Sequence, residues 1–258
     1  MDEYVVTWDD SKIIPTLKQE IINKLGENTW NLLIDGISVP HHETEKTLGC
    51  KNMRILIERL EKAADADTVK TILTRIRHGY GYTPINGVSK EFIDCGCDLD
   101  TYLEYCKEKF KQELIRHNTK GTRFWGDLIT DEALDYFLNT EGVLAPVRKG
   151  SELHITRYPY DLENYFKETD ERKKRFLFCH CLFARTSILS DEGTVSKIMC
   201  YCSLGLIIKS WEETLGVRLN GEVVSSVLGG DDICKLIIKL PDEIMKKYVK
   251  TEEHEHDK

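Results

Sequence analysis

The sequence is short of the features that direct a chain to a membrane, to secretion or to nucleic acid. No apolar run approaches the roughly 20 residues that cross a bilayer, and the start, MDEYVVTWDD, has no basic region followed by an apolar stretch. Basic residues are the minority, with 36 Lys and Arg against 44 Asp and Glu and a net charge of −8. A nucleic-acid partner requires a basic surface, because phosphates must be neutralised. We therefore expect a cytoplasmic protein that binds neither membranes nor nucleic acid.

What the sequence does have is cysteine. It contains nine among 258 residues, and an odd number cannot form a complete set of intramolecular disulfides. In a reducing compartment the thiols stay reduced, so clustered cysteines indicate metal ligands or reactive thiols before they indicate disulfides. The length is sufficient to bury a sizeable core, in one large domain or two small ones.

Apolar residues recur at helical spacing through the first half of the chain. This spacing predicts helices over residues 13–25, 53–64, 69–76 and 99–114, and a short helix that ends at 138. Asp67 is expected to cap the third of these helices by accepting backbone N–H bonds, and either Thr130 or Asp131 is expected to cap the last.

The pattern changes after Gly142. Alternating residues and turn signals predict strands over residues 143–147, 152–158, 175–181, 217–228 and 233–240. A short helix is predicted over 161–167, and a longer one over 204–215 with Ser203 as its cap. The Gly/Asp-rich segment 229–232 suits the tight connection between the last two strands.

These elements predict an α+β fold, with a helical N-terminal half and a C-terminal antiparallel sheet with packed helices. We divide the chain into a helical region at 1–140 and an α+β domain of small-molecule-binding type at 141–250. The acidic tail, 251–258, is expected to be disordered.

Two Cys-x-Cys pairs carry the strongest chemical signal: Cys179 with Cys181, and Cys200 with Cys202. Zinc favours four soft ligands in a tetrahedron, and two thiolate pairs would supply them. The second pair immediately precedes a predicted helix, whose N-terminus lowers thiol pKa. In an ideal strand the Cα atoms of the first pair lie about 6.6 Å apart, so chelation by both sulfurs requires a local bend. Cys234, after a hairpin turn, is a reserve ligand.

Other interpretations of these residues stay open. The thiols can be small buried hydrophobes, or Cys202 can act as a nucleophile with His180 as its base. The predicted strand places His180 on the face opposite the sulfurs, which favours a packed or hydrogen-bonded histidine. Cys95 and Cys97 lie in a loop before a helix, where they either pack against the core or form a redox-active or metal-binding dithiol.

Two stretches resemble known families. The segment LHITRYPYDLENYFKE, followed by FLFCHC, resembles the L-2-amino-thiazoline-4-carboxylic acid hydrolase-like family, although Tyr158 stands where that family often has cysteine. The segment CYCSLGLIIKSWEETLGVRLNGEVVSSVLGGDDICKLIIKLP is similar to the vinyl-reductase-like small-molecule-binding domain. The residues that match its pattern are Cys202, Gly205, Trp211, Gly216, Ser226, Gly230, Asp231 and Cys234. The resemblance covers roughly residues 150–241, and the whole layout is similar to cysteine-rich bacterial proteins.

The resemblance implies a fold and a small-molecule pocket, which we expect between the helix 204–215 and the sheet. Our first hypothesis is a small-molecule-binding protein with a structural zinc ion held by its cysteines, namely Cys179, Cys181, Cys200 and Cys202, with Cys234 able to substitute for one of them. The alternative is a hydrolase of a small cyclic amide or thiazoline carboxylate, which uses metal-bound water or a cysteine thiolate. A structural or partner-binding protein without a pocket is the third hypothesis. A homodimer is compatible with all three.

Overall fold

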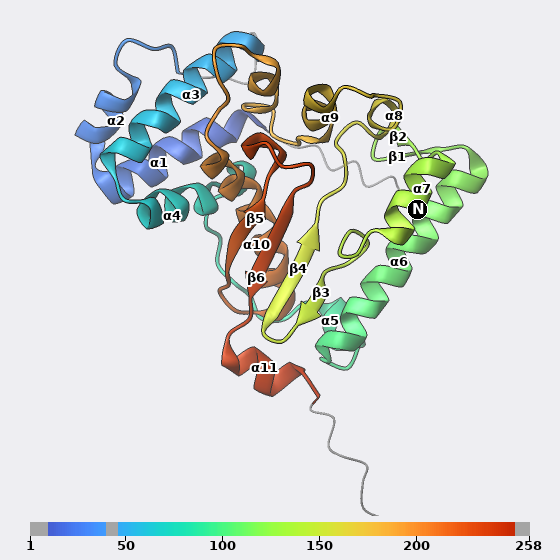
Figure 1. Cartoon of the computed structure of the whole chain (residues 1–258). Coiled ribbons are helices and arrows are strands. Elements are labelled where there is room, and N and C mark those ends of the chain that lie inside the picture. The colour runs from blue at the N-terminus through green and yellow to red at the C-terminus, as the bar shows by residue number, and fades with distance from the viewer. Residues whose placement is uncertain (1–9, 40–45, 251–258) are drawn as a thin grey trace, which may run out of the picture.

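The computed structural model describes residues 10–39 and 46–250, so the predicted disordered tail at 251–258 lies outside the described residues. The first half is helical, as predicted (Figure 1). Its helices are α1 (Ile13–Leu25), α2 (Glu27–Ile34), α3 (Lys46–Ala63), α4 (Ala66–Ile76), α5 (Lys90–Asp94), α6 (Leu99–Lys120) and α7 (Asp131–Asn139). A 3-10 turn, η2 (Arg77–Gly79), follows α4, and a small hairpin of β1 (Arg123–Phe124) and β2 (Asp127–Leu128) separates α6 from α7.

The second half contains one four-stranded antiparallel sheet with helices around it, which confirms the α+β fold. Its strands are β3 (Val147–Lys149), β4 (Glu152–Thr156), β5 (Asn220–Ser225) and β6 (Lys235–Lys239), in the order β3-β4-β6-β5. Its helices are α8 (Leu162–Tyr165), α9 (Glu171–Phe178), α10 (Cys200–Leu215) and α11 (Asp242–Tyr248). In Figure 1, α10 lies behind the sheet, with α1–α4 on one side and α6 and α7 on the other.

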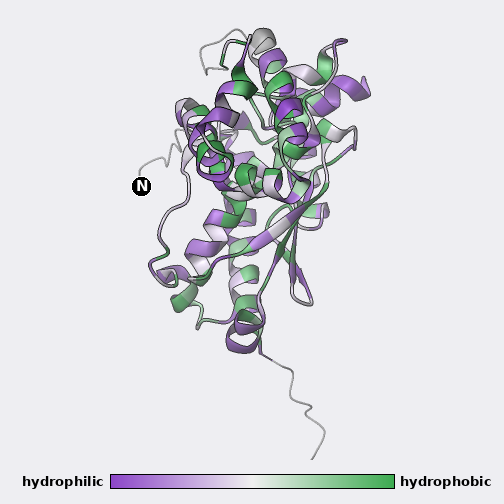
Figure 2. Cartoon of the chain, turned by 90° about the vertical axis from the view of Figure 1, so that its left-hand side faces the viewer, coloured by the Kyte–Doolittle hydropathy of each residue, from purple (hydrophilic) through white to green (hydrophobic). Residues whose placement is uncertain are grey.

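One cluster of buried side chains joins the two halves. It runs from Ile13 on α1 to Tyr248 on α11 and includes the apolar stripe of α10. Helices α4 and α10 cross very closely, since a Cβ added at Gly205 would lie 1.9 Å from the carbonyl oxygen of Thr74. Figure 2 shows that the helices on this side of the molecule carry both polar and apolar residues, as expected of helices that bury one face. The division at residue 140 remains a prediction.

Four local predictions are wrong. The strand predicted over residues 143–147 is a turn, and β3 begins only at Val147. Residues 175–181 do not form a strand, because Asp170 caps α9 by accepting the backbone N–H of Lys173, and the helix continues to Phe178. Asp65 rather than Asp67 caps α4, through the backbone N–H of Thr68. Helix α10 begins at Cys200, so Ser203 lies within its first turn instead of preceding it.

No helix within the described ranges combines the length and the apolar character that a membrane crossing requires.

A cluster of cysteine, histidine and arginine at the start of α10

The antiparallel register brings three chain segments to one edge of the sheet. Thr156 at the end of β4 and Ser225 at the end of β5 both pair with Lys235, the first residue of β6. The residues just beyond these strands therefore meet. The backbone N–H of Arg157 donates to the carbonyl of Cys234 at 2.9 Å, and the Sγ of Cys234 accepts the backbone N–H of Val227 at 3.4 Å.

Helix α10 begins at the same edge. The Sγ of Cys200 lies 2.9 Å from the Oγ of Ser226, which follows β5. Since α4 approaches α10 closely at Gly205, the turn that follows α4 also arrives here. The Nε2 of His78, on that turn, lies 3.4 Å from the Oγ of Ser203.

The thiols of both Cys-x-Cys stretches lie close enough to affect one another. Burial raises the pKa of Cys179 to about 12, and the neighbouring Cys234 contributes. Burial also raises the pKa of Cys181 well above its ordinary value, with further contributions from Cys179, Cys202 and Cys200. The pKa of Cys200 is raised in the same way. These three thiols are therefore protonated at neutral pH, and the two stretches do meet beside the start of α10.

The same thiols do not form a metal centre as they stand. Within residues 10–39 and 46–250, no group of three or more His, Cys, Asp or Glu side chains is placed to hold a metal ion. The predicted zinc ligands Cys179, Cys181, Cys200, Cys202 and Cys234 thus gather in one region without a ligand geometry. The nine cysteines, all within the described residues, form no disulfide with one another, and Cys95 and Cys97 lie in the loop between α5 and α6.

His180 lies beside these cysteines with both ring nitrogens engaged. Its Nε2 lies 2.7 Å from the carbonyl oxygen of Tyr158, and its Nδ1 lies 3.3 Å from Nη2 of Arg157. The carbonyl can only accept and the guanidinium can only donate, so Nε2 carries the proton and Nδ1 accepts. Burial, followed by the charge of Arg157, lowers the pKa of His180 well below its ordinary value. The role of His180 as a base for Cys202 remains a prediction, and its lone pair is directed to Arg157.

Two guanidinium groups face this region without a carboxylate partner. Arg157 is half-buried and forms no ion pair with any described residue. Its charge lowers the pKa of His78, which burial lowers first, to about 4. Arg185 lies between the rings of Tyr160 and Phe176, 4.3 and 4.4 Å from their centroids, and its Nε is buried without a hydrogen-bond partner. The region therefore holds two guanidinium groups and neutral histidines, together with the carboxylate of Asp231, which accepts the backbone N–H of Ser226 at 2.8 Å.

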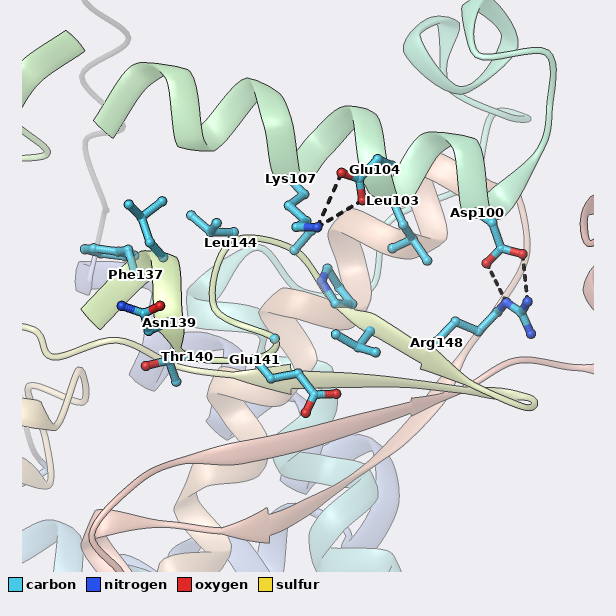
Figure 3. Close-up of a pocket in the computed structure, with 15 residues that line it drawn as sticks. Asp100, Leu103, Glu104, Lys107, Phe137, Asn139, Thr140, Glu141, Leu144 and Arg148 are labelled. Atoms are coloured by element: carbon cyan, nitrogen blue, oxygen red, sulfur yellow. Dashed lines mark hydrogen bonds and ion pairs between the residues drawn. The ribbon is translucent and has the colours of Figure 1, made fainter. Parts of the chain in front are cut away.

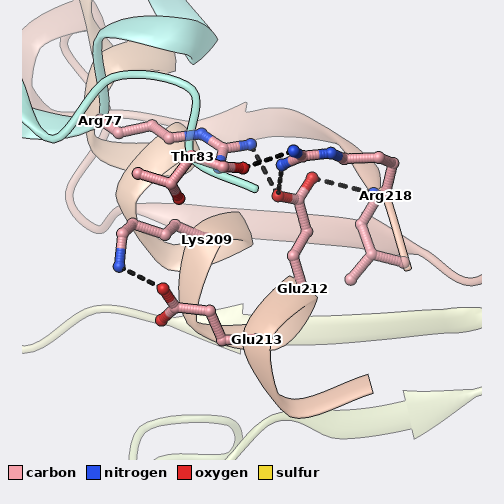
Figure 4. A network of polar contacts seen from close by, with 7 residues as sticks. Arg77, Thr83, Lys209, Glu212, Glu213 and Arg218 are labelled. Carbon is pink, nitrogen blue, oxygen red and sulfur yellow. Dashed lines mark hydrogen bonds and ion pairs between the residues drawn. The ribbon is translucent and has the colours of Figure 1, made fainter. Parts of the chain in front are cut away.

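The far end of α10 is anchored by a buried ion-pair network (Figure 4). Glu212 accepts hydrogen bonds from Nη2 of Arg77 and Nη1 of Arg218, both at 2.8 Å. The backbone N–H of Leu219 donates to the other oxygen of Glu212, and Arg218 also donates to the carbonyl of Thr83. Arg77 and Glu212 are each only 2% exposed. This network fixes the turn that carries His78 against α10.

We predicted the ligand pocket between α10 and the sheet. Leu204 and Ile208 of α10 are fully buried and reach β5 at Gly221. A pocket of about 470 Å³ lies elsewhere, between α6 and the segment from α7 to β3 (Figure 3). Its charged groups already have partners, since Arg148 makes two hydrogen bonds of 2.7 Å to Asp100 and Lys107 pairs with Glu104. No unpaired charge is left in it to recruit a ligand.

The sequence interpretation missed His78 and Arg157 as members of the site. Helix α4 ends at Ile76, just before His78. The sequence offered one signal, the pair His78-Gly79 directly after the apolar stripe of α4. In the structure the chain turns there through left-handed backbone conformations at residues other than glycine. Arg77 and His78 both have φ of 51°. Such conformations are costly for residues other than glycine and concentrate at functional sites.

Comparisons with known proteins do not identify the chain: no family model, curated protein or solved structure matches it.

Proposed function

We propose that this chain is a small-molecule-binding protein that binds a carboxylate ligand at the start of α10. The observation that carries the proposal is Arg157, a half-buried guanidinium that forms no ion pair with a described residue. Buried charges in proteins are normally paired, so an unpaired guanidinium in such a position is suited to an anion from outside.

The surroundings of Arg157 support an anionic ligand. The neighbouring His78 and His180 are neutral, so they do not compete with Arg157 for negative charge. Arg185 adds a second positive charge, and its Nε is without a partner.

The resemblance noted in the sequence suggests which carboxylate to test. A thiazoline carboxylate combines a small ring with one negative charge. The rings of Tyr158 and Tyr160 contact His180 edge to face, with centroids 5.3 and 5.6 Å away. A compact ring with a carboxylate is therefore compatible with the side chains around Arg157.

Titration calorimetry with L-2-amino-thiazoline-4-carboxylate and with its carboxamide, which lacks the carboxylate charge, tests the proposal. The wild type should bind the carboxylate at least tenfold more tightly, because a hydrogen bond to a charged group contributes about 1.5–3 kcal/mol. Arg157→Gln should lose this preference. Arg148→Gln, which removes a surface arginine paired with Asp100, should retain it. Equal affinity for both compounds, or an unchanged preference in Arg157→Gln, would contradict the proposal.

A thiol-bound zinc ion is the second candidate, favoured by the gathering of cysteines from three segments. Binding would deprotonate thiols whose pKa is raised, and it would require the side chains to rotate into a tetrahedron. Metal analysis of reduced, tag-free protein purified without oxygen tests it. One equivalent of zinc in the wild type and less than a tenth in Cys181→Ser would support the site. Metal-free wild-type protein that remains folded would exclude a structural zinc ion.

A further inference from the structure

Ser203 and His78 form the only described pair at the start of α10 that joins a hydroxyl to an imidazole. Their side chains are 125 positions apart in sequence, and the Oγ to Nε2 distance is 3.4 Å. Both residues are half-buried. A nucleophile and its base often lie slightly beyond hydrogen-bond distance before a substrate binds.

Three features hold the two side chains in place. Gly205, two residues after Ser203, lets α10 approach the backbone of Thr74 on α4. The turn after α4 adopts left-handed φ at Arg77 and His78, and its next residue, Gly79, leaves no room for a Cβ against Lys12. The pairing of Arg77 with Glu212 then fixes this turn to α10. A strained turn of this kind persists only where its surroundings determine it, and such turns concentrate at functional sites.

We propose that Ser203 is a nucleophile and His78 its general base, so that the start of α10 is a serine-type hydrolytic site for a small amide or ester. In the first step the Oγ of Ser203 bonds to the carbonyl carbon, and Nε2 of His78 takes the hydroxyl proton. The carbon–nitrogen or carbon–oxygen bond then breaks, and His78 returns that proton to the leaving atom. Water, activated by the same imidazole, hydrolyses the acyl-serine and restores both residues.

The imidazole of His78 is in the unprotonated form that a general base requires. His78 is neutral at neutral pH, because burial and Arg157 lower its pKa to about 4, so its ring can accept a proton. Ser203 lies in the first turn of α10, which places its hydroxyl beside the imidazole of His78. That the substrate carries a carboxylate rests on the proposed function, because Arg157 would bind that group. The assignment of Ser203 as nucleophile and His78 as base does not depend on it.

A fluorophosphonate probe tests the pair without a known substrate. The Oγ of an activated serine displaces fluoride from phosphorus, and mass spectrometry of peptides locates the new bond. We expect wild-type protein to be labelled at Ser203, and Ser203→Ala to remain unlabelled there. His78→Asn should slow labelling at least 100-fold, because general base catalysis contributes about 10²–10⁴. Asn tolerates left-handed φ, so the turn should persist.

Two controls make the result decisive. His154→Asn removes a surface histidine that contacts Glu152, and it should label at the wild-type rate. Thermal melts establish that each variant is folded under the labelling conditions. Folded wild-type protein that is not labelled at Ser203 would overturn the proposal, and so would equal rates in the wild type and folded His78→Asn. Because the probe carries no carboxylate, either result is independent of whether Arg157 binds one.

Discussion

The first and last turns of helix α10 differ in whether the charged side chains beside them have partners of opposite charge. At the last turn, Glu212 meets Arg77 and Arg218, and both of its oxygens accept hydrogen bonds. At the first turn, Arg157 has no carboxylate partner among the described residues, and the imidazoles beside it are neutral. Both turns belong to the same helix, which packs on one sheet.

This difference indicates that the last turn of α10 serves stability and the first turn serves binding or chemistry. A buried charge that has its partners contributes to a fixed arrangement, whereas a buried charge without one is destabilising unless a ligand completes it. Removal of a side chain should therefore affect mainly stability at the last turn and mainly binding or chemistry at the first. Substitutions at the two ends can break this contrast or sharpen it.

The largest effect should come from Glu212→Ala. It leaves the fully buried Arg77 without its carboxylate, and breaking a buried pair on one side costs about 3–5 kcal/mol. The free energy of unfolding from urea denaturation measures the loss. Glu213→Ala is the matched control, because Glu213 is exposed and pairs with Lys209 at the surface, where a pair contributes less than about 1 kcal/mol. Similar losses in the two variants would mean that the buried network is not an anchor.

Gly205→Ala should have the next largest effect. The added Cβ would lie 1.9 Å from the carbonyl oxygen of Thr74, so α4 and α10 must separate. We expect a loss of about 1–3 kcal/mol, as for other overpacked contacts, although alanine is ordinarily the better helix former. Labelling of Ser203 by the fluorophosphonate should fall as well, because His78 moves with α4. Ser210→Ala, on the exposed side of α10, should change neither quantity.

The close contact at Gly205 also shows what the sequence could and could not predict. Periodicity located α1, α4, α6 and α10 within a few residues, because one-sided burial is encoded in the spacing of apolar residues. The segment 175–181 was predicted wrongly, since alternation over a few residues also fits the last turn of a capped helix. Local signals of this length do not separate a strand from a helix end.

The site was predictable only in part, because some of its contacts depend on how distant helices pack against each other. The two Cys-x-Cys stretches do meet, and their spacing beside a helix start was visible in the sequence. The approach of His78 to Ser203 depends on how α4 crosses α10, and that crossing is a tertiary property of Gly205 and its neighbours. Arg157 became informative only when its lack of a carboxylate partner among the described residues could be seen.

The pH dependence of stability offers a third test, because His78 is neutral in the folded chain. Its pKa is about 4 when folded and near 6.5 when unfolded. Between these values the unfolded chain binds more protons, so this contribution to stability is complete above pH 6.5 and is lost as the pH falls toward 4. Asp127 acts oppositely, since burial, Asp161 and Glu163 raise its pKa to about 6.

His78→Asn separates these two contributions. The variant should lose the His78 contribution and keep that of Asp127, so its stability should fall less steeply than that of the wild type as the pH is lowered from 6.5 to 4. Urea unfolding at a series of pH values measures both curves. Parallel curves would show that His78 titrates alike in the folded and unfolded chains, and the first turn of α10 would then be more open to water than the structure indicates.

Arg157→Gln should have the smallest effect on stability. It removes a hydrogen bond to His180 but no ion pair with a described residue, so the free energy of unfolding should change by less than about 1 kcal/mol. Arg218→Gln removes a partner of the buried Glu212 and should cost about 1–3 kcal/mol. A loss in Arg157→Gln as large as that in Arg218→Gln would make Arg157 a structural residue. The two ends of α10 would then not differ, and the carboxylate proposal would lose the observation on which it depends.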